Sequence, residues 1–270
     1  MINPKLAGIP ETMLWTLHNR ASEAARPDGV IKDPHCLSIY RSLDYDYEKS
    51  FGKPDGSHGI RSLIFDRKIR EFLAQHPDGV IINLGEGLET QRYRIADEEA
   101  VWVSLDLPEG IAVREHFIQP DDRHLHLGIS AFDTAWFDSI PAGRAVFITA
   151  QGLLMFFSEQ QVRRLLQLIV KRFPDAWLMF DHLPRWMSAM TCREKGLNIT
   201  PHYRAPRMPW GINKNEIEPT LSRWLDKSIS VEDIPFRFPR GKWRIVKGIV
   251  DIMPVLRNRA YGISFIKTVA

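Results

Sequence analysis

Two glycines and an acidic residue have the types and the spacing that a nucleoside-binding site requires. Gly85 and Gly87 directly follow an apolar run, and glycines at such a turn let backbone N–H groups approach a ligand without an obstructing Cβ. Asp106 comes about twenty residues later, where a carboxylate can accept hydrogen bonds from both hydroxyl groups of a ribose. Alone, the glycines also fit an ordinary turn and Asp106 an ordinary helix cap. Together they favour a cofactor site.

The third glycine position indicates which class of cofactor the loop would hold. A dinucleotide fingerprint would place that glycine at position 90, and the residue there is Thr90. The loop therefore favours a ligand without phosphate, such as S-adenosylmethionine, over a pyrophosphate. A nicotinamide-dependent oxidoreductase is an alternative, because such enzymes also have a glycine loop followed by an acidic residue. It is less favoured because Thr90 replaces the third glycine.

Further candidate residues lie at or after the ends of later strands. Gln151 and Gly152 follow the fourth predicted strand, at the edge where open α/β sheets bind ligands. His182 follows the fifth and is the candidate general base for a hydroxyl acceptor, whereas a carboxylate acceptor is already ionised and needs no base. Tyr203 and Trp210 are candidates for an apolar acceptor pocket. His182 equally fits a loop histidine, and the two aromatic residues equally fit the core.

Composition and charge narrow the class of protein. The 270 residues carry a formal net charge of +3, without a basic stripe that would indicate nucleic acid. No apolar run approaches the roughly 20 residues that cross a membrane, and the N-terminus lacks a secretion signal. Cys36 and Cys192 have no metal-ligand spacing and fit free thiols in a reducing compartment. We therefore expect a cytoplasmic protein with no bound metal, no nucleic-acid partner and no membrane partner.

The elements that must position these residues lie in the middle of the chain. Short apolar runs alternate there with helical patterns, which is typical of a parallel sheet with right-handed crossovers. The pattern predicts strands over 80–84, 101–105, 125–129, 145–148 and 177–180. It also predicts a helix over 158–173, where Ser158 and Gln161 form a capping box.

The flanking parts of the chain differ from the middle in the secondary structure that their patterns predict. Helices are predicted over 12–25, with Thr12 as its cap, and over 61–75, with a glycine-containing loop between them. After residue 183 we expect a strand over 228–236, a helix over 243–256 and a final strand that contains Tyr261, Ile263 and Phe265. We predict one domain, with 1–75 as an N-terminal helical cap, 76–182 as the cofactor-binding core, and 183–270 as a substrate lid and C-terminal strands.

Five stretches of the sequence are together similar to the leucine carboxyl methyltransferase and polyketide O-methyltransferase (tetracenomycin-type) family. They are RSLIFDRKIREF at 61–72, INLGEGLETQRYR at 82–94, WVSLDLPE at 102–109, FITAQGLLMFF at 147–157 and PWGI at 209–212. The resemblance implies an α/β Rossmann-like class I methyltransferase: a mostly parallel seven-stranded sheet with helices on both faces and an N-terminal helical cap.

The resemblance also implies which residues hold S-adenosylmethionine. Arg61 would pair with the methionine carboxylate, Asp106 would hold the ribose, and Gln151 would lie beneath the amino group. Ser130 and Ala131 fall where the family contacts adenine. The full set that it implies is Arg61, Gly85, Gly87, Asp106, Leu107, Ser130, Ala131 and Gln151.

Three positions depart from the family pattern. Gln91 replaces an arginine, Gln151 replaces a glutamate, and Ser130 stands where the family often has aspartate. An amide at position 151 loses a charge-assisted hydrogen bond, which predicts cofactor binding weaker by ~1–2 kcal/mol. The resemblance predicts an O-methyltransferase acting on a carboxyl or hydroxyl group of a small molecule, polyketide-like or another secondary metabolite. The alternative is a non-catalytic cofactor-binding relative with a regulatory or partner role, and a homodimer is kept open.

Overall fold

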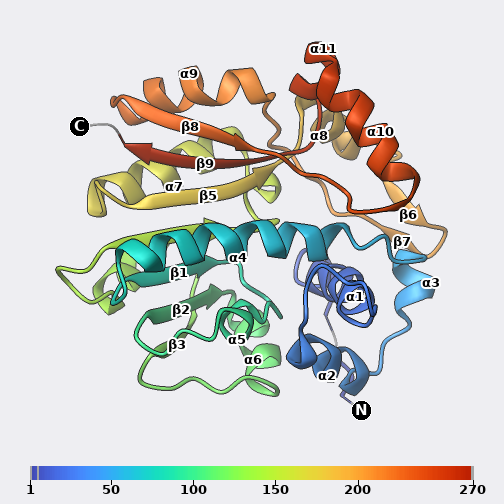
Figure 1. The fold of residues 1–270 in the computed structure, drawn as a ribbon, viewed down its shortest axis with the longest axis horizontal. Coiled ribbons are helices and arrows are strands. Elements are labelled where there is room, and N and C mark those ends of the chain that lie inside the picture. The colour runs from blue at the N-terminus through green and yellow to red at the C-terminus, as the bar shows by residue number, and fades with distance from the viewer. Residues whose placement is uncertain (1, 5, 269–270) are drawn as a thin grey trace.

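Seven strands form one sheet in the order β3-β2-β1-β4-β5-β9-β8 in the computed structural model, which describes residues 2–4 and 6–268 (Figure 1). The strands are β1 (Val80–Leu84), β2 (Val101–Asp106), β3 (His124–Gly128), β4 (Val146–Ala150), β5 (Trp177–His182), β8 (Ile229–Ile234) and β9 (Gly262–Thr268). The first five are parallel, and β9 runs antiparallel between β5 and β8. This confirms the predicted mostly parallel seven-stranded sheet.

The parallel strands form because their side chains are apolar on both faces. All residues of β1 and β4 are buried, as expected for a sheet that helices cover on both sides. Leu84 pairs with Leu105 of β2 and with Ala150 of β4, so these three strands end together. The chain order reverses between β1 and β4, and such a switch point is where open α/β sheets bind ligands.

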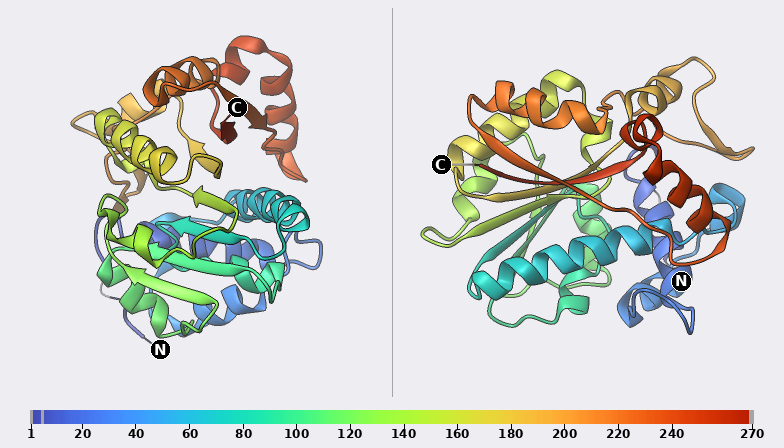
Figure 2. Two further views of the ribbon diagram at one scale, coloured as in Figure 1. Left: turned by 90° about the vertical axis from the view of Figure 1, so that its left-hand side faces the viewer. Right: turned by 45° about the horizontal axis from the view of Figure 1, so that its top comes forward.

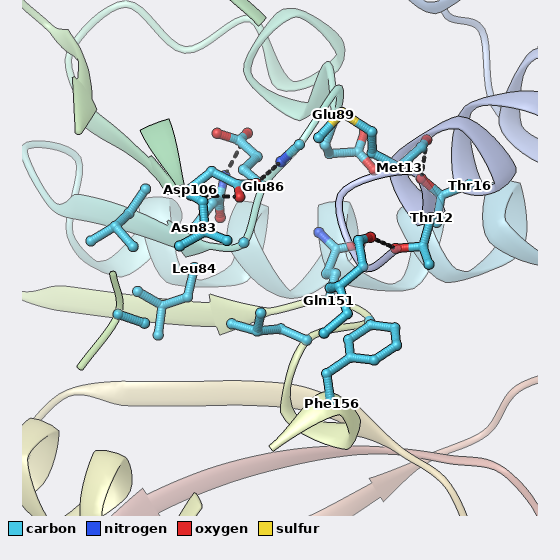
Figure 3. Close-up of a pocket in the computed structure, with 18 of the residues that line it drawn as sticks. Thr12, Met13, Thr16, Asn83, Leu84, Glu86, Glu89, Asp106, Gln151 and Phe156 are labelled. Atoms are coloured by element: carbon cyan, nitrogen blue, oxygen red, sulfur yellow. Dashed lines mark hydrogen bonds between the residues drawn. The ribbon is translucent and has the colours of Figure 1, made fainter. Parts of the chain in front are cut away.

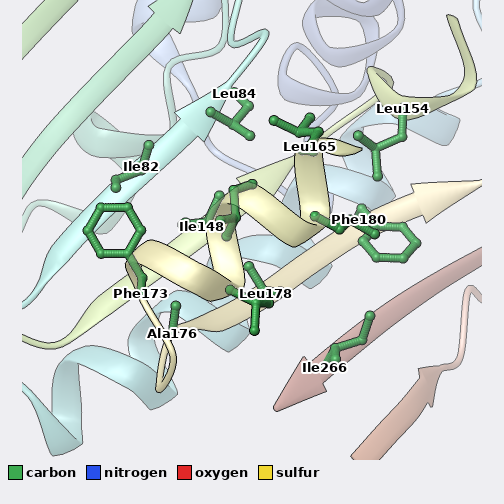
Figure 4. Close-up of a cluster of buried hydrophobic side chains, with 14 of the residues drawn as sticks. Ile82, Leu84, Ile148, Leu154, Leu165, Phe173, Ala176, Leu178, Phe180 and Ile266 are labelled. Carbon is green, nitrogen blue, oxygen red and sulfur yellow. The ribbon is translucent and has the colours of Figure 1, made fainter. Parts of the chain in front are cut away.

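Helices cover the two faces of the sheet (Figure 2). On one face, α7 (Glu159–Arg172) and α9 (Lys214–Leu225) bury alternate strand residues such as Ile82, Ile148 and Leu178 (Figure 4). On the other face, α4 (Ser57–Gln75) packs on the residues in between, among them Ile81 and Phe147. The alternation follows from the period of two along a strand.

The predicted N-terminal helices are present with changed boundaries. The capping box of α7 is confirmed, with Ser158 before the helix and Gln161 in its first turn. Thr12 begins α1 (Thr12–Ala24) but does not cap it, because its hydroxyl donates to the Ile9 carbonyl. The helix predicted over 61–75 starts earlier, at Ser57. The stretch predicted as a loop contains α2 (Pro34–Ser42) and α3 (Tyr47–Phe51), which Asp33 and Asp46 cap.

The remaining elements connect the strands. They are α5 (Gln91–Ile95), α6 (Pro108–Glu115), the turns η1 (Thr134–Ser139) and η2 (Leu154–Phe156), α8 (Arg185–Cys192), the hairpin β6 (Asn198–Thr200) and β7 (Tyr203–Arg204), α10 (Gly241–Ile252) and α11 (Pro254–Asn258). The helix predicted over 243–256 is therefore two helices, and Pro254 starts the second. No helix in the described part of the chain is long and apolar enough to cross a membrane. The division into cap, core and lid stays a prediction.

Candidate active site

The carboxyl ends of β1, β2 and β4 border a cavity that α1 covers from the opposite side (Figure 3). Its walls come from the N-terminal helix, the glycine loop after β1, and the loops after β2, β3 and β4. They include Ile9, Pro10, Thr12, Met13, Thr16, Arg20, Arg61, Asn83, Leu84, Gly85, Glu86, Gly87, Glu89, Leu105, Asp106, Leu107, Ile129, Ser130, Ala131, Thr149, Gln151, Gly152, Leu153, Phe156 and Phe157.

The structure brings all eight residues of the predicted cofactor set to this cavity. Arg61, Gly85, Gly87, Asp106, Leu107, Ser130, Ala131 and Gln151 come from five separate segments, and each lines its wall. Their individual contacts to a cofactor stay a proposal. Among the lining residues that the sequence reasoning missed are those of α1, above all Arg20, because the sequence shows no sign of which face of that helix meets the cavity.

The glycine loop takes a conformation that requires glycine. Gly85 and Gly87 have φ values of 62° and 54°, in the left-handed region that other residues rarely occupy. A Cβ added to Gly87 would lie 3.0 Å from Cβ of Met13, so the loop and α1 approach each other closely. These two positions therefore set the distance between the loop and the helix that covers the cavity.

Asp106 is held at the end of β2 by two backbone N–H groups. Gly87 N–H donates to Oδ2 and Leu107 N–H to Oδ1, each at 2.7 Å. Burial raises the pKa of Asp106 above its ordinary value, while these two N–H groups act in the opposite direction. Each carboxylate oxygen keeps a further lone pair for a ligand hydroxyl group.

Two buried arginines fix the carbonyl groups of the glycine loop. Arg114 of α6 donates from Nη1 to the carbonyls of Gly87 and Glu89, each at 2.8 Å. Arg20 of α1 donates to the Leu88 carbonyl at 2.6 Å. Because these carbonyls are tied down behind the loop, the loop conformation is set before any ligand arrives.

A third buried arginine, Arg94, binds carboxylates behind the loop and supplies the charge that position 91 lacks. Its guanidinium binds Asp66 through two hydrogen bonds of 2.8 and 2.9 Å, Asp33 at 2.7 Å and Glu89 at 2.6 Å. Gln91 is buried beside it and donates to Asp66 at 2.8 Å. Burial alone would raise the pKa of Glu89, but Arg20 and Arg94 lower it well below its usual range. The departure at Gln91 therefore leaves the ion network behind the loop intact.

Arg61 is held by a buried aspartate that the sequence reasoning missed. Asp181, the residue before the end of β5, accepts from Arg61 Nη1 at 2.9 Å, from the Tyr261 hydroxyl at 2.6 Å and from Gly152 N–H at 2.6 Å. A Cβ added to Gly152, where φ is 67°, would lie 2.8 Å from Arg61 Nη1. Glycine at position 152 therefore lets the guanidinium lie against the loop after β4.

Two unpaired polar atoms test whether this cavity fits the amino-acid end of S-adenosylmethionine. Arg61 Nε and Gln151 Oε1 are buried and have no hydrogen-bond partner among the described residues. Both side chains line the cavity. A guanidinium N–H can donate to the methionine carboxylate and an amide oxygen can accept from its ammonium group. With Asp106 suited to the ribose, the donors and acceptors present fit this cofactor.

His182 lies away from the cavity, which corrects the catalytic role expected for it. The ring is fully buried. Its Nδ1 donates to the Ile212 carbonyl at 3.1 Å, and the Ser264 hydroxyl lies 3.3 Å from Nε2. Burial lowers the pKa of His182 to about 4. His182 is buried because β9 pairs with β5 and places Gly262 against the imidazole ring.

The His182→Asn variant is expected to lose stability less steeply in acid than the unchanged protein. The ordinary pKa of histidine is 6.5, and the pKa of His182 in the folded protein is about 4. Between these two pH values the unfolded chain binds a proton at His182 and the folded chain does not, so falling pH favours unfolding. This costs up to ~1.4 kcal/mol per pH unit. Urea unfolding from about pH 7 to about pH 5 measures the slope. The exposed His116→Asn control should keep the original slope, and an equal slope in His182→Asn would contradict the assignment.

Tyr203 and Trp210 also lie outside the cavity lining, so their expected acceptor-pocket role is corrected. Trp210 is only 2% exposed and packs on Phe180 with ring centroids 5.9 Å apart. Tyr203 packs edge-on against Phe51 at 4.7 Å, because the hairpin β6–β7 folds onto α3. Both are core residues.

Solved structures with a similar fold are methyltransferases. The magnesium protoporphyrin IX methyltransferase ChlM from Synechocystis PCC 6803, with bound SAH, has a TM-score of 0.50 and 10% identity, over 87% of this chain and 93% of that chain. The CurJ carbon methyltransferase has a TM-score of 0.52 and 12% identity, over 97% of this chain and 68% of that chain. At these identities the likeness concerns the fold alone. The fold is that of the class I S-adenosylmethionine-dependent methyltransferases.

Sequence relatives narrow that class. The chain is 29% identical over 247 residues to the tetracenomycin polyketide synthesis O-methyltransferase TcmP of Streptomyces glaucescens, covering 88% of this chain and 90% of the relative. It is 25% identical over 189 residues to the S-adenosyl-L-methionine-dependent methyltransferase dpfgK of Gibberella zeae, 63% of each chain. No protein-family model matches. The chain is therefore an S-adenosylmethionine-dependent methyltransferase that is similar to a polyketide O-methyltransferase, and the nicotinamide alternative is set aside.

The Gln151→Glu variant is expected to bind S-adenosylhomocysteine about tenfold more tightly, ~1.4 kcal/mol, because a carboxylate restores a charge-assisted bond to the ammonium group. Gln151→Leu should bind it about tenfold more weakly, since the unpaired Oε1 acceptor is lost. Isothermal titration calorimetry of both variants checks the pair. Equal affinity of Gln151→Leu and the unchanged protein would remove position 151 from the cofactor site.

Proposed function

We propose that this chain transfers the methyl group of S-adenosylmethionine to a carboxylate oxygen of a small polyketide-like acid. The choice of a carboxylate as the methyl acceptor rests on the titratable side chains that line the cavity. They are Arg20, Arg61, Glu86, Glu89 and Asp106. The arginines are permanently charged, and a carboxylate acceptor arrives ionised and needs no base.

The three acidic side chains of the cavity are already engaged. Glu86 accepts from the Asn83 amide at 2.9 Å and lies 3.3 Å from Arg114. Glu89 lies between Arg20 and Arg94, and Asp106 accepts two backbone N–H groups. A hydroxyl acceptor would need one of them to take its proton, and the loss of negative charge would weaken these ion pairs and N–H bonds, which disfavours that chemistry.

The walls around the acceptor are proposed to be apolar. Ile9, Pro10 and Met13 come from the N-terminal segment, and Phe156 and Phe157 come from the loop after β4. The sulfonium centre of the cofactor supplies a reactive methyl group and a good leaving group. The protein's part is to align the acceptor oxygen with that group and to exclude water. In the transfer a C–O bond forms, the C–S bond breaks with its electron pair left on sulfur, and no proton moves.

Paired acceptors test this proposal. The full chain, with S-adenosylmethionine, would be given a polycyclic aromatic acid and the phenol that lacks its carboxyl group. We expect a methyl ester from the acid, identified by mass spectrometry and by its cleavage in mild alkali, at a rate that is flat from about pH 6 to about pH 9. A methyl ether from the phenol with no ester would overturn the carboxylate assignment. Cofactor binding without turnover of either acceptor would favour the non-catalytic alternative.

The location is part of the same proposal. Cys36 and Cys192 are both free thiols, and Cys36 is buried. Free thiols support the expected cytoplasmic location, because extracellular compartments oxidise them. A small-molecule acceptor is the partner that this function requires, and the homodimer stays a prediction.

A further inference from the structure

The helices α10 and α11 carry a large exposed apolar surface. The surface consists of Trp243, Ile245, Val246, Ile249, Ile252, Met253, Val255 and Leu256, and we call it the α10–α11 surface. Ile252 is 82% exposed and Ile245 is 69% exposed. Outside this surface, the exposed large apolar side chains of the described residues are only Ile9, Leu107 and Trp186. Such a concentration marks a binding surface, because soluble proteins rarely expose contiguous apolar patches.

The α10–α11 surface is embedded in positive charge. Residues 241–259 contain five of the 36 lysines and arginines of the chain and one of its 33 acidic residues, Asp251. This segment accounts for the positive sign of the net charge of +3, because the rest of the chain is net negative. Asp251 is neutralised by Lys247, and Arg257 pairs with Asp233 outside the segment. Lys242, Arg244 and Arg259 are exposed.

The other described residues of the chain do not cover α10. None of its 12 residues is buried, and Gly248 lies in its middle. Helices shorter than about 12–15 residues are marginal in water without tertiary packing, and a central glycine weakens them further. At 100° per residue, Ile245, Ile249 and Ile252 share one half of the helix, while Arg244, Lys247 and Asp251 share the other. In the first turn the arrangement is mixed, because Lys242 lies on the half with the isoleucines and Trp243 on the half with the charged residues. The helix is therefore amphipathic, with its apolar half open.

The positive charge of the α10–α11 surface favours a lipid membrane over a second copy of the chain as its binding partner. Two copies joined through this surface would bring two cationic helices together, and like charges at an interface cost several kcal/mol. An amphipathic helix with lysine and arginine beside tryptophan and aliphatic residues is instead suited to lie in an anionic membrane interface. Trp186 adds a second exposed tryptophan next to α11, since its Nε1 donates to the Arg259 carbonyl at 2.8 Å.

The position of the surface relates it to the cavity. The segment leaves β8 after Ile234 and enters β9 at Gly262, which pairs with His182 at the carboxyl end of β5. In Figure 1, α10 and α11 lie beyond this end of β5, beside α8. The cavity opens at the same edge of the sheet, where β1, β2 and β4 end. A membrane bound at α10–α11 would therefore lie on the cavity side of the molecule.

We propose that the α10–α11 surface binds an anionic lipid membrane, with α10 in the plane of the interface. The sequence predicts no membrane partner because no apolar run can span a bilayer, and an in-plane helix does not need one. The apolar half of α10 enters the acyl boundary, Arg244 meets the headgroups, and the long side chain of Lys242 reaches up to them from the first turn of the helix. This inference does not depend on the identity of the methyl acceptor.

Flotation of the full protein with lipid vesicles tests the proposal. Vesicles of phosphatidylcholine with about one third phosphatidylglycerol should bind the protein at least about tenfold more tightly than pure phosphatidylcholine. Binding should fall in about 1 M NaCl, where the screening length is about 3 Å. The Ile245→Asn/Ile252→Asn variant should lose at least about tenfold in binding, and Lys242→Gln/Arg244→Gln about tenfold.

Matched variants keep the result interpretable. Ile245→Val/Ile252→Val keeps the surface apolar, and Arg163→Gln/Arg164→Gln removes two exposed charges from α7; both should bind like the unchanged protein. Unchanged S-adenosylhomocysteine affinity in every variant shows that the fold and the cofactor site are intact. No binding, or equal binding to charged and uncharged vesicles, would overturn the proposal. A solution dimer that Ile245→Asn/Ile252→Asn dissociates would instead make this surface a contact between two copies.

Discussion

The Arg94→Met variant is expected to lose about 3–5 kcal/mol of its free energy of unfolding, the range for breaking a buried ion pair from one side. The guanidinium contacts Asp33 before α2, Asp66 in α4 and Glu89 in the glycine loop, and all three carboxylates are at least 95% buried as side chains. Removing it takes the arginine partner from Asp33 and Asp66 and leaves Glu89 with Arg20 alone. Thermal unfolding followed by circular dichroism should show a Tm lower by roughly 10 °C.

A control for this loss lies two residues away in the same helix. Arg92 also forms an ion pair, with Asp121 at 2.6 Å, but the Asp121 side chain is 51% exposed. The Arg92→Met variant should cost at most about 1 kcal/mol, because exposed pairs contribute little. Arg94→Lys keeps the positive charge but lacks the planar guanidinium fork that binds both oxygens of Asp66. Its loss in free energy of unfolding should therefore lie between those of Arg92→Met and Arg94→Met. Equal Tm values for Arg92→Met and Arg94→Met would show that the network does not stabilise the fold.

The Asp106→Asn variant is expected to bind S-adenosylhomocysteine about 100-fold more weakly, ~2.7 kcal/mol, because hydrogen bonds to a charged acceptor contribute ~1.5–3 kcal/mol each. The amide that replaces one oxygen cannot accept from Gly87 or Leu107 N–H, the two donors that hold the carboxylate. The side chain at position 106 therefore loses both its fixed orientation and its negative charge. Isothermal titration calorimetry measures the affinity directly.

The same substitution on the surface separates binding from stability. Asp138 is exposed in η1 and is absent from the cavity lining, so Asp138→Asn should leave the affinity unchanged. Thermal unfolding of Asp106→Asn should show whether the variant remains folded at the titration temperature. An affinity within about threefold of the unchanged protein, in a folded variant, would remove Asp106 from the ribose site.

The cofactor side of the site could be predicted because local sequence determines it. A buried parallel strand has to end at a turn. Gly85 follows β1 and Asp106 is the last residue of β2, and these neighbouring strands end at the same edge. Spacing along the chain therefore translates into proximity. The same logic placed Gln151 correctly at the cavity, because β4 is the other neighbour of β1.

The acceptor side could not be predicted in this way. His182 also follows a parallel strand, but β9 arrives from about 80 residues later and buries it, and nothing near residue 182 indicates that pairing. The role of Arg94 could not be predicted for a related reason. Its partners Asp33, Asp66 and Glu89 lie on three separate elements, and only the packing of α2, α4 and the glycine loop brings them together.

The placement of β9 between β5 and β8 has a consequence for how the chain is made. During synthesis β8 emerges before β9, yet it has no partner in the sheet until β9 has formed the strand between them. Until then β5 presents an open edge with unpaired N–H and C=O groups, and β8 presents two. The nascent chain therefore passes through a stage with exposed strand edges next to the apolar segment 243–256. Chaperone dependence should accordingly be greatest in the interval between the synthesis of β8 and that of β9.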